Sequence, residues 1–292
     1  MKKLLTILII CLLLCGCNNK PENNKSVDLN AINIFNYDNI KQFEFDLHSQ
    51  EYMLVRMSDL NVLYSKYADK KIYPASLTKL MTADVALNLV KDLNETSSFS
   101  YEQYVQLIND DASLAYLNIG QEYTIRDLLY ALILPSGADA AVALENYFTN
   151  HNMVLIDEMN KQLKKLGCND SNFVNTTGLH DDNHYTTLND LFKILMDVLS
   201  YEDGRKLLET MSYKMEDEKV MHSSLRFIRD NKAHALGGKT GYTSESGQSV
   251  IVLYKANNRS YILMLANAMG DPYHKEEFWH FDDAMEILNK LY

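Results

Sequence analysis

The chain has 292 residues, of which 47% are apolar, enough to bury a sizeable core, and this composition excludes a disordered polypeptide. Lys and Arg number 28 against 39 Asp and Glu, so the formal net charge is −11 at pH 7. Because so acidic a protein is a poor match for phosphate backbones, we expect no nucleic-acid partner.

The first residues predict an export signal that ends at a lipid-attachment site. Lys2 and Lys3 precede an apolar run at 4–14, which is typical of a secretory signal and short for a membrane span. The sequence Leu-Cys-Gly-Cys at 14–17 resembles a bacterial lipobox, in which Cys17 becomes the lipid-modified first residue. The alternative is an ordinary signal, or an uncleaved anchor, that merely ends near Cys17.

We therefore expect a lipoprotein signal peptide at 1–16, a flexible tether at 17–35 after the lipidated cysteine, and one continuous catalytic domain at 36–292. Residues 18–30 are rich in Asn, Lys, Glu and Ser and hardly contain an apolar residue, a composition that stays solvated. Acyl chains on Cys17 would hold the protein on a membrane surface. The expected location is the outer face of the bacterial cytoplasmic membrane.

The folded part predicts strands at both ends and helices between them. Alternating residues around a turn at 58–61 predict a hairpin over 51–68, and apolar runs at 249–255 and 260–266 flank a second turn. The helical period predicts helices at 77–90, 125–134, 138–148, 154–166 and 188–199, with a closing helix at 276–291. This order implies an α+β fold: an antiparallel sheet from both chain ends, flanked by helices, with an inserted helical lobe and a site at the seam.

The first of three chemically informative strings is Ser-Leu-Thr-Lys at 76–79, which follows Pro74 at a helix start. Residues three apart share a helix face, so Lys79 lies one turn from Ser76. A lysine whose pKa is lowered by burial or by other cations can take the proton of a serine hydroxyl. Taken alone, the string also fits a serine that caps a helix beside a solvated lysine.

The second string, Ser-Gly-Ala at 136–138, follows a predicted helix that Thr124 and Asp127 cap and Pro135 ends. Ser136 therefore lies on a tight loop, where its hydroxyl either relays a proton or merely caps the next helix.

The third string, Lys-Thr-Gly at 239–241, lies in a predicted strand whose small residues let a ligand backbone approach closely. Lys239 and Thr240 offer a cation and a hydroxyl to a carboxylate, although Lys-Thr-Gly is also a common turn.

Together and in this order, the strings resemble the signature of penicillin-binding proteins and class A β-lactamases. The resemblance is specifically to the low-molecular-mass D-alanyl-D-alanine carboxypeptidases, peptidase family S11, and it implies a fold like that of β-lactamases and DD-peptidases. The matching segments are Tyr-Pro-Ala-Ser-Leu-Thr-Lys at 73–79, Leu-Pro-Ser-Gly-Ala-Asp at 134–139, Asn-Thr-Thr-Gly-Leu at 175–179, His-Tyr-Thr-Thr at 184–187 and Gly-Lys-Thr-Gly-Tyr-Thr at 238–243.

The resemblance implies a serine-type, penicillin-sensitive D-Ala-D-Ala carboxypeptidase that removes the terminal D-Ala of peptidoglycan stem peptides through an acyl-enzyme. Ser76 would be the acylated nucleophile, Lys79 its base and Ser136 a proton relay. The expected partners are the stem peptide, β-lactams as covalent inhibitors and the membrane that holds the lipid. No metal or organic cofactor is implied.

The substrate-binding residues that the resemblance implies lie on one strand. Lys239 and Thr240 would grip the terminal carboxylate of the substrate, and Gly241 and Tyr242 would line the same strand. The backbone N–H groups of Ser76 and Tyr242 would form the oxyanion hole.

One residue departs from the family pattern, because Ala138 stands where the family normally has an Asn whose amide binds substrate and helps order the lysine. Its loss lowers the rate by about ten- to a hundredfold unless Asp139 or a water substitutes. Ala138 is thus the best argument for the alternative function, a weakly active or inactive lipoprotein that binds cell-wall peptides.

The sequence disfavours two other classes of enzyme. The Glu-x-x-Leu-Asn loop of class A β-lactamases is missing between Ser136 and Lys239, so we expect slow covalent labelling by penicillin instead of rapid hydrolysis. The run His-Asp-Asp-Asn-His at 180–184 has the residue types of a metallopeptidase site, but its loop lacks helical spacing and favours structural histidines. Cys168, the one cysteine outside the predicted lipoprotein signal and its lipidated end, is expected to be buried and chemically inert.

Overall fold

The computed structural model describes residues 45–225, 235–269 and 278–291. The expected signal peptide, Cys17 and the tether lie outside the described residues, so lipid attachment stays a prediction. Within the described ranges, no helix combines the length and the apolar character that a membrane crossing requires.

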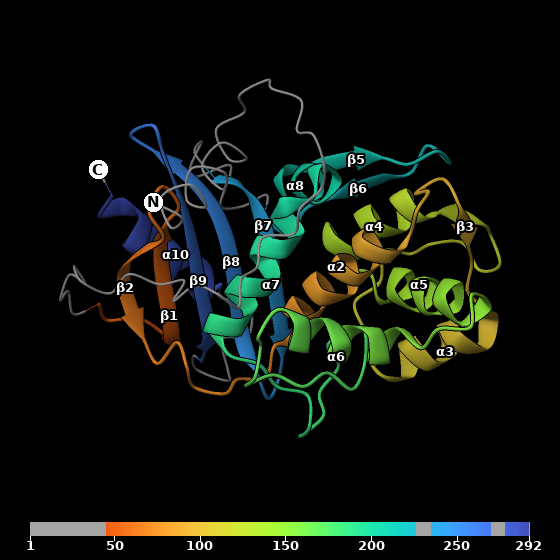
Figure 1. Ribbon diagram of the computed structural model, residues 1–292, viewed down its shortest axis with the longest axis horizontal. Coiled ribbons are helices and arrows are strands. Elements are labelled where there is room, and N and C mark those ends of the chain that lie inside the picture. The colour runs from red at the N-terminus through yellow and green to blue at the C-terminus, as the bar shows by residue number, and fades with distance from the viewer. Residues whose placement is uncertain (1–44, 226–234, 270–277, 292) are drawn as a thin grey trace.

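A five-stranded antiparallel sheet forms one half of the molecule, with the strand order β2-β1-β9-β8-β7 (Figure 1). The first two strands come from the N-terminal hairpin and the other three from the C-terminal part, so the predicted sheet from both chain ends is confirmed. The strands are β1 (Ser49–Arg56), β2 (Asn61–Lys66), β7 (Ala235–Thr243), β8 (Gly247–Ala256) and β9 (Arg259–Ala268).

In sequence, the residues between β2 and β7 form a helical lobe. This lobe lies beside β7 in Figure 1. Two small two-stranded sheets, β3–β4 and β5–β6, accompany the lobe. The helices are η2 (Ala75–Thr78), α2 (Lys79–Leu89), α3 (Tyr101–Asn109), α4 (Ile125–Ile133), α5 (Ala138–Asn150), α6 (Leu155–Lys165), α7 (Leu188–Ser200), α8 (Glu202–Glu209) and α10 (Trp279–Asn289), and the short strands are β3 (Thr96–Ser97), β4 (Tyr123–Thr124), β5 (Ser212–Lys214) and β6 (Val220–His222).

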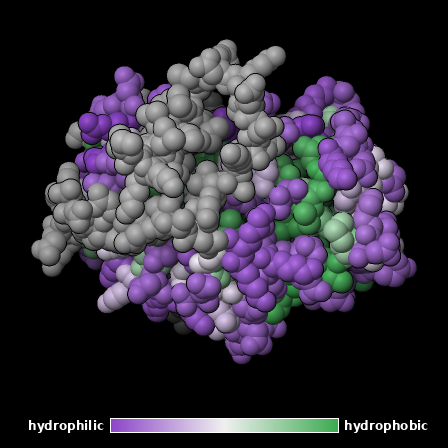
Figure 2. All heavy atoms as spheres, in the orientation of Figure 1, coloured by the Kyte–Doolittle hydropathy of each residue, from purple (hydrophilic) through white to green (hydrophobic). Residues whose placement is uncertain are grey.

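Helices cover both faces of the sheet, which explains why its strands are continuously apolar instead of alternating. Met53 packs into the core shared with the helical lobe, whereas its neighbour Leu54 packs into a second core with Phe281 and Ile287 of α10. Successive side chains of a strand point to opposite faces, so both faces of β1 must be apolar. On the face shown in Figure 2, the coloured residues are mostly hydrophilic, and a hydrophobic stripe lies over the helical lobe.

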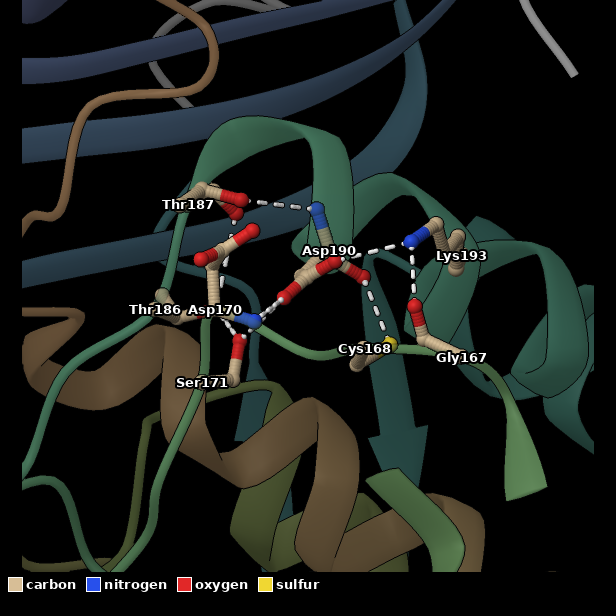
Figure 3. Close-up of polar contacts among 8 residues, drawn as sticks. All are labelled: Gly167, Cys168, Asp170, Ser171, Thr186, Thr187, Asp190 and Lys193. Atoms are coloured by element: carbon tan, nitrogen blue, oxygen red, sulfur yellow. Dashed lines mark hydrogen bonds and ion pairs between the residues drawn. The ribbon is translucent and has the colours of Figure 1, made fainter. Parts of the chain in front are cut away.

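The beginning of α7 is fixed by a polar network around Asp190 (Figure 3). Thr187 caps the helix by accepting the N–H of Asp190, and the Asp190 carboxylate accepts from Ser171 and pairs with Lys193. Cys168 is 3% exposed and its thiol donates to the Asp190 carbonyl oxygen, while burial raises its thiol pKa. The expectation of a buried, unreactive Cys168 is therefore consistent with its surroundings.

Candidate active site

The helix that carries Ser76 starts differently from the predicted helix over 77–90. A turn of 3-10 helix, η2, comes first, and the α-helix begins at Lys79. Ala75 has a positive φ of 46°, an uncommon conformation for a residue with a Cβ atom. This bend places Ser76 at the entrance of the helix, and Lys79 Nζ lies 2.9 Å from Ser76 Oγ.

Lys79 is buried, with an exposed fraction of 1%, and its amine donates a second hydrogen bond of 2.8 Å to the carbonyl oxygen of Thr177. Burial lowers the pKa of Lys79 to about 7, although the nearby Asp139 carboxylate acts in the opposite direction. A large fraction of the Lys79 amine is therefore uncharged at neutral pH, the state in which it can accept a proton.

Ser136 lies between α4 and α5 in a left-handed conformation with φ 67°. The tight loop is held by the N–H of Gly137, which donates to the Ala131 carbonyl, and by the N–H of Ala138, which donates to the Ser113 carbonyl. The predicted cap of α4 is present, because Thr124 Oγ1 accepts the N–H of Asp127.

Lys239 reaches Ser136 from the sheet, with its Nζ 2.8 Å from Ser136 Oγ and 2.8 Å from the Thr240 carbonyl oxygen. Its side chain is fully buried. Burial is the main cause that lowers the pKa of Lys239 well below its ordinary value, and the charge of Lys79 adds to it. Burial thus disfavours the charged form of both amines, each of which contacts a serine hydroxyl.

The strand β7 runs directly beside the start of the nucleophile helix. A Cβ atom on Gly241 would lie 3.1 Å from the Pro74 carbonyl oxygen and 3.3 Å from the Leu77 nitrogen, so the two backbones approach closely at this glycine. The next residue, Tyr242, is 60% exposed. The structure therefore brings Lys239, Gly241 and the start of the Ser76 helix together.

Two features beside these residues have no counterpart among the predicted site residues. Ser224 Oγ lies 2.7 Å from Thr240 Oγ1, and the N–H of Ser224 donates to the Leu134 carbonyl oxygen next to the Ser136 loop. Ser224 therefore adds a second hydroxyl beside Thr240. No local sequence signal marks it.

The segment 175–179 is the other missed feature, although its sequence is part of the family resemblance. Asn175 Oδ1 accepts the N–H groups of Thr177 and Gly178 and so folds the segment into a tight turn. Gly178 has φ +85°, and a Cβ atom there would lie only 1.9 Å from the Ala75 carbonyl oxygen. The turn therefore packs backbone to backbone against the residue that precedes the serine.

Asp139 does not take the place of the missing amide at 138. Its Oδ1 accepts the N–H of Ala115 and its Oδ2 accepts the N–H of Leu117, each at 2.9 Å. The carboxylate thus anchors the loop before α4 and acts on Lys79 only through its charge.

The histidine loop has structural contacts. His184 is buried, its Nδ1 accepts the N–H of Val174, and its Nε2 lies 2.7 Å from Thr78 Oγ1. Burial lowers the pKa of His184 to about 4, so the ring is neutral at pH 7. Within the described residues, His, Cys, Asp and Glu side chains form no group of three that could hold a metal ion.

Ser76 has a buried amine one turn away, and a second serine, on the helical lobe, contacts a lysine from the edge of the sheet. This arrangement is typical of serine acyl-transfer sites of the penicillin-binding type. Residues 38–270 match the family model of the D-alanyl-D-alanine carboxypeptidases, Peptidase_S11. The chain belongs to this family, as its sequence indicated.

Individual relatives agree with this assignment. D-alanyl-D-alanine carboxypeptidase DacF of Bacillus subtilis is 27% identical over 227 residues, which are 74% of this chain and 56% of the relative. The D-alanyl-D-alanine endopeptidase of Escherichia coli is 27% identical over 248 residues, 83% of this chain and 76% of the relative. The chain thus spans little more than half the length of the Bacillus relative.

The fold is similar to that of the Streptomyces K15 DD-transpeptidase, with a TM-score of 0.74 at 24% identity over 85% of this chain and 98% of that chain. The prediction of a DD-peptidase-like α+β fold is therefore confirmed.

Proposed function

We propose that this protein is a serine-type D-Ala-D-Ala carboxypeptidase that removes the terminal D-Ala of peptidoglycan stem peptides through an acyl-enzyme. The observation that carries the proposal is the buried Lys79 amine 2.9 Å from the Ser76 hydroxyl. Membership of the family supports the same activity.

In the acylation step, neutral Lys79 takes the proton of Ser76 as Oγ bonds to the carbonyl carbon of the penultimate D-Ala. The C–N bond to the terminal D-Ala then breaks, and the leaving amine receives, by way of the Ser136 hydroxyl, the proton that Lys79 took from Ser76, so that Lys79 is neutral again; Lys239 holds the Ser136 hydroxyl in place. Water hydrolyses the acyl-enzyme and releases the shortened peptide. Backbone N–H groups of Ser76 and Tyr242 would stabilise the oxyanion, a role supported by the approach of β7 to η2.

The terminal carboxylate of the substrate would lie against Lys239, Thr240 and Ser224. A carboxylate there favours the charged form of Lys239, because an opposite charge raises the pKa of a lysine. The charge of Lys239 in turn keeps Lys79 neutral and ready to act as base. Substrate binding therefore assigns a different protonation state to each of the two buried amines.

β-Lactams would acylate Ser76 as covalent inhibitors, because the same serine attacks their strained amide. Membership of the family supports this reactivity. We further propose that the protein is exported and held on the outer face of the cytoplasmic membrane by a lipid on Cys17, as the lipobox resemblance indicates.

A weakly active or inactive protein that binds cell-wall peptides is the second candidate, and Ala138 favours it. Asp139 is committed to backbone N–H groups and supplies no substitute for the missing amide. The two functions differ in turnover but share the reactive serine.

Release of free D-Ala from a pentapeptide that ends in D-Ala-D-Ala tests the proposal, with Ser76→Ala as the control. Turnover that Ser76→Ala abolishes supports a carboxypeptidase. Acylation by penicillin without D-Ala release would favour the binding protein, and the absence of both would overturn the acyl-transfer function.

A further inference from the structure

We propose that Glu145 is a positioning residue, which holds the base Lys79 in place through the turn at 175–179. This role presupposes the acyl-transfer function proposed for Ser76. Glu145 lies on α5, two helical turns after Ala138. It belongs to none of the three strings that match the family signature.

The first step is the contact between α5 and the turn. The hydroxyl of Thr176 donates a short hydrogen bond to Glu145 Oε1. Thr176 is completely buried, and burial raises the pKa of Glu145, an effect that the hydrogen bond from Thr176 opposes. Glu145 is half-buried, and a carboxyl that has lost part of its water is costly without such a partner, so this pair fixes where the turn lies on α5.

The second step is the contact between the turn and the helix of the lysine. Thr82 Oγ1 donates a 2.8 Å hydrogen bond to the Thr176 carbonyl oxygen, and Lys79 Nζ donates one of the same length to the next carbonyl, that of Thr177. The turn is therefore held from both sides, by α5 through a side chain and by α2 through two backbone oxygens. The Thr177 carbonyl in turn orients the Lys79 amine toward Ser76.

The third step concerns Ala138, because the side chain that normally orders the lysine from the start of α5 is missing here. Glu145 lies on the same helix, but it contacts the turn at 175–179, whose Thr177 carbonyl accepts the hydrogen bond from Lys79. Small displacements of a catalytic group cost large factors in rate. Loss of the Glu145–Thr176 bond should therefore slow the chemistry more than it weakens substrate binding.

The acylation rate with a fluorescent penicillin tests this role in the full-length protein. We expect Glu145→Ala to lower the maximal rate about tenfold with a less than twofold change in the half-saturating concentration. Glu145→Gln keeps an oxygen that accepts from Thr176 and should stay within about twofold of wild type. The control is Glu158→Ala on α6, whose carboxylate pairs with Lys161 on its own helix, and it should leave the rate unchanged.

Glu145→Ala at the wild-type rate, or Glu145→Gln as slow as Glu145→Ala, would overturn the positioning role. No acylation of wild type would instead overturn the function itself. If Glu145→Ala does not fold, the same hydrogen bond can be tested at Thr176. Thr176→Val removes the hydroxyl and should slow acylation, whereas Thr176→Ser keeps it and should not. Ala138→Asn should raise the acylation rate by a larger factor in Glu145→Ala than in wild type, and equal factors would contradict a shared task for these two positions of α5.

Discussion

Lys239 Nζ on the edge strand of the sheet lies 2.8 Å from Ser136 Oγ on the helical lobe, although the two residues are 103 positions apart. This contact joins the sheet to the helical lobe. Lys79 and Ser76 form a second lysine–serine pair, and the charge of Lys79 acts on Lys239.

The pH dependence of acylation should report the protonation of Lys79. Its pKa in the free enzyme is lowered to about 7 by burial, and only the uncharged amine accepts the serine proton, so the second-order rate constant of acylation, which reports the free enzyme, should rise as the pH increases through about 7 and level off above. Penicillin acylation measured from pH 5 to pH 9 checks this. A rate that is flat across that range would argue that Lys79 is not the base.

Lys79→Arg should abolish the rise of the acylation rate around pH 7 and lower that rate roughly 10²–10⁴-fold, because a guanidinium is always protonated and cannot accept the serine proton. A Lys79→Arg variant with a near-normal rate would contradict the proposed role directly.

Ala138→Asn should raise D-Ala release from a pentapeptide by about tenfold. The amide would add a hydrogen-bond partner for the peptide or for the lysine, worth roughly 1–1.5 kcal/mol in the reacting complex. Steady-state turnover of both proteins gives the answer. Unchanged or lower turnover would mean that the site is complete without this amide.

Ser224→Ala should raise KM for the peptide about fivefold with little change in kcat. Its hydroxyl lies 2.7 Å from Thr240 Oγ1, and removal of one hydrogen bond to a carboxylate costs about 1 kcal/mol in binding. A KM equal to that of wild type would place the substrate carboxylate away from Ser224.

Gly178→Ala should both destabilise the fold and impair acylation. The new Cβ atom would meet the Ala75 carbonyl oxygen at 1.9 Å, so either the turn at 175–179 or the residue before Ser76 must move. We expect a loss of roughly 3–5 kcal/mol in the free energy of unfolding, measured by denaturant titration.

Gly120→Ala is the matched control, because Gly120 also has a positive φ, of +73°, but a Cβ atom there meets nothing within 4 Å. Its cost should be about 1 kcal/mol, from backbone strain alone. Equal losses in the two variants would show that the contact with Ala75 is unimportant.

The sequence predicted the parts of the site that depend on short-range spacing. A spacing of three residues at a helix start predicted that Lys79 lies beside Ser76. The hairpin over 51–68 and the apolar runs at 249–255 and 260–266 predicted a sheet built from both chain ends. The exact helix start escaped prediction, because the positive φ of Ala75 depends on packing against Gly178 and β7. Helix α3 was also missed, since it is short and polar, although Ser100 and Gln103 form a capping box at its start.

Contacts between residues far apart in sequence were beyond the reach of local patterns. The carbonyl of Thr177 holds Lys79 across 98 positions, and Glu145 meets Thr176 across 31. A carbonyl oxygen has no residue signature, and one glutamate on a helix looks like any solvated residue. Such partners can be identified only from the three-dimensional structure.

Mass spectrometry of peptides from the penicillin-treated protein tests the central claim, that the Ser76 hydroxyl beside the buried Lys79 amine is the nucleophile. We predict a mass increase of one whole penicillin molecule on the peptide that contains Ser76, and no increase in the Ser76→Ala variant. A label on another residue, or a wild-type protein that stays unlabelled while folded, would contradict the account.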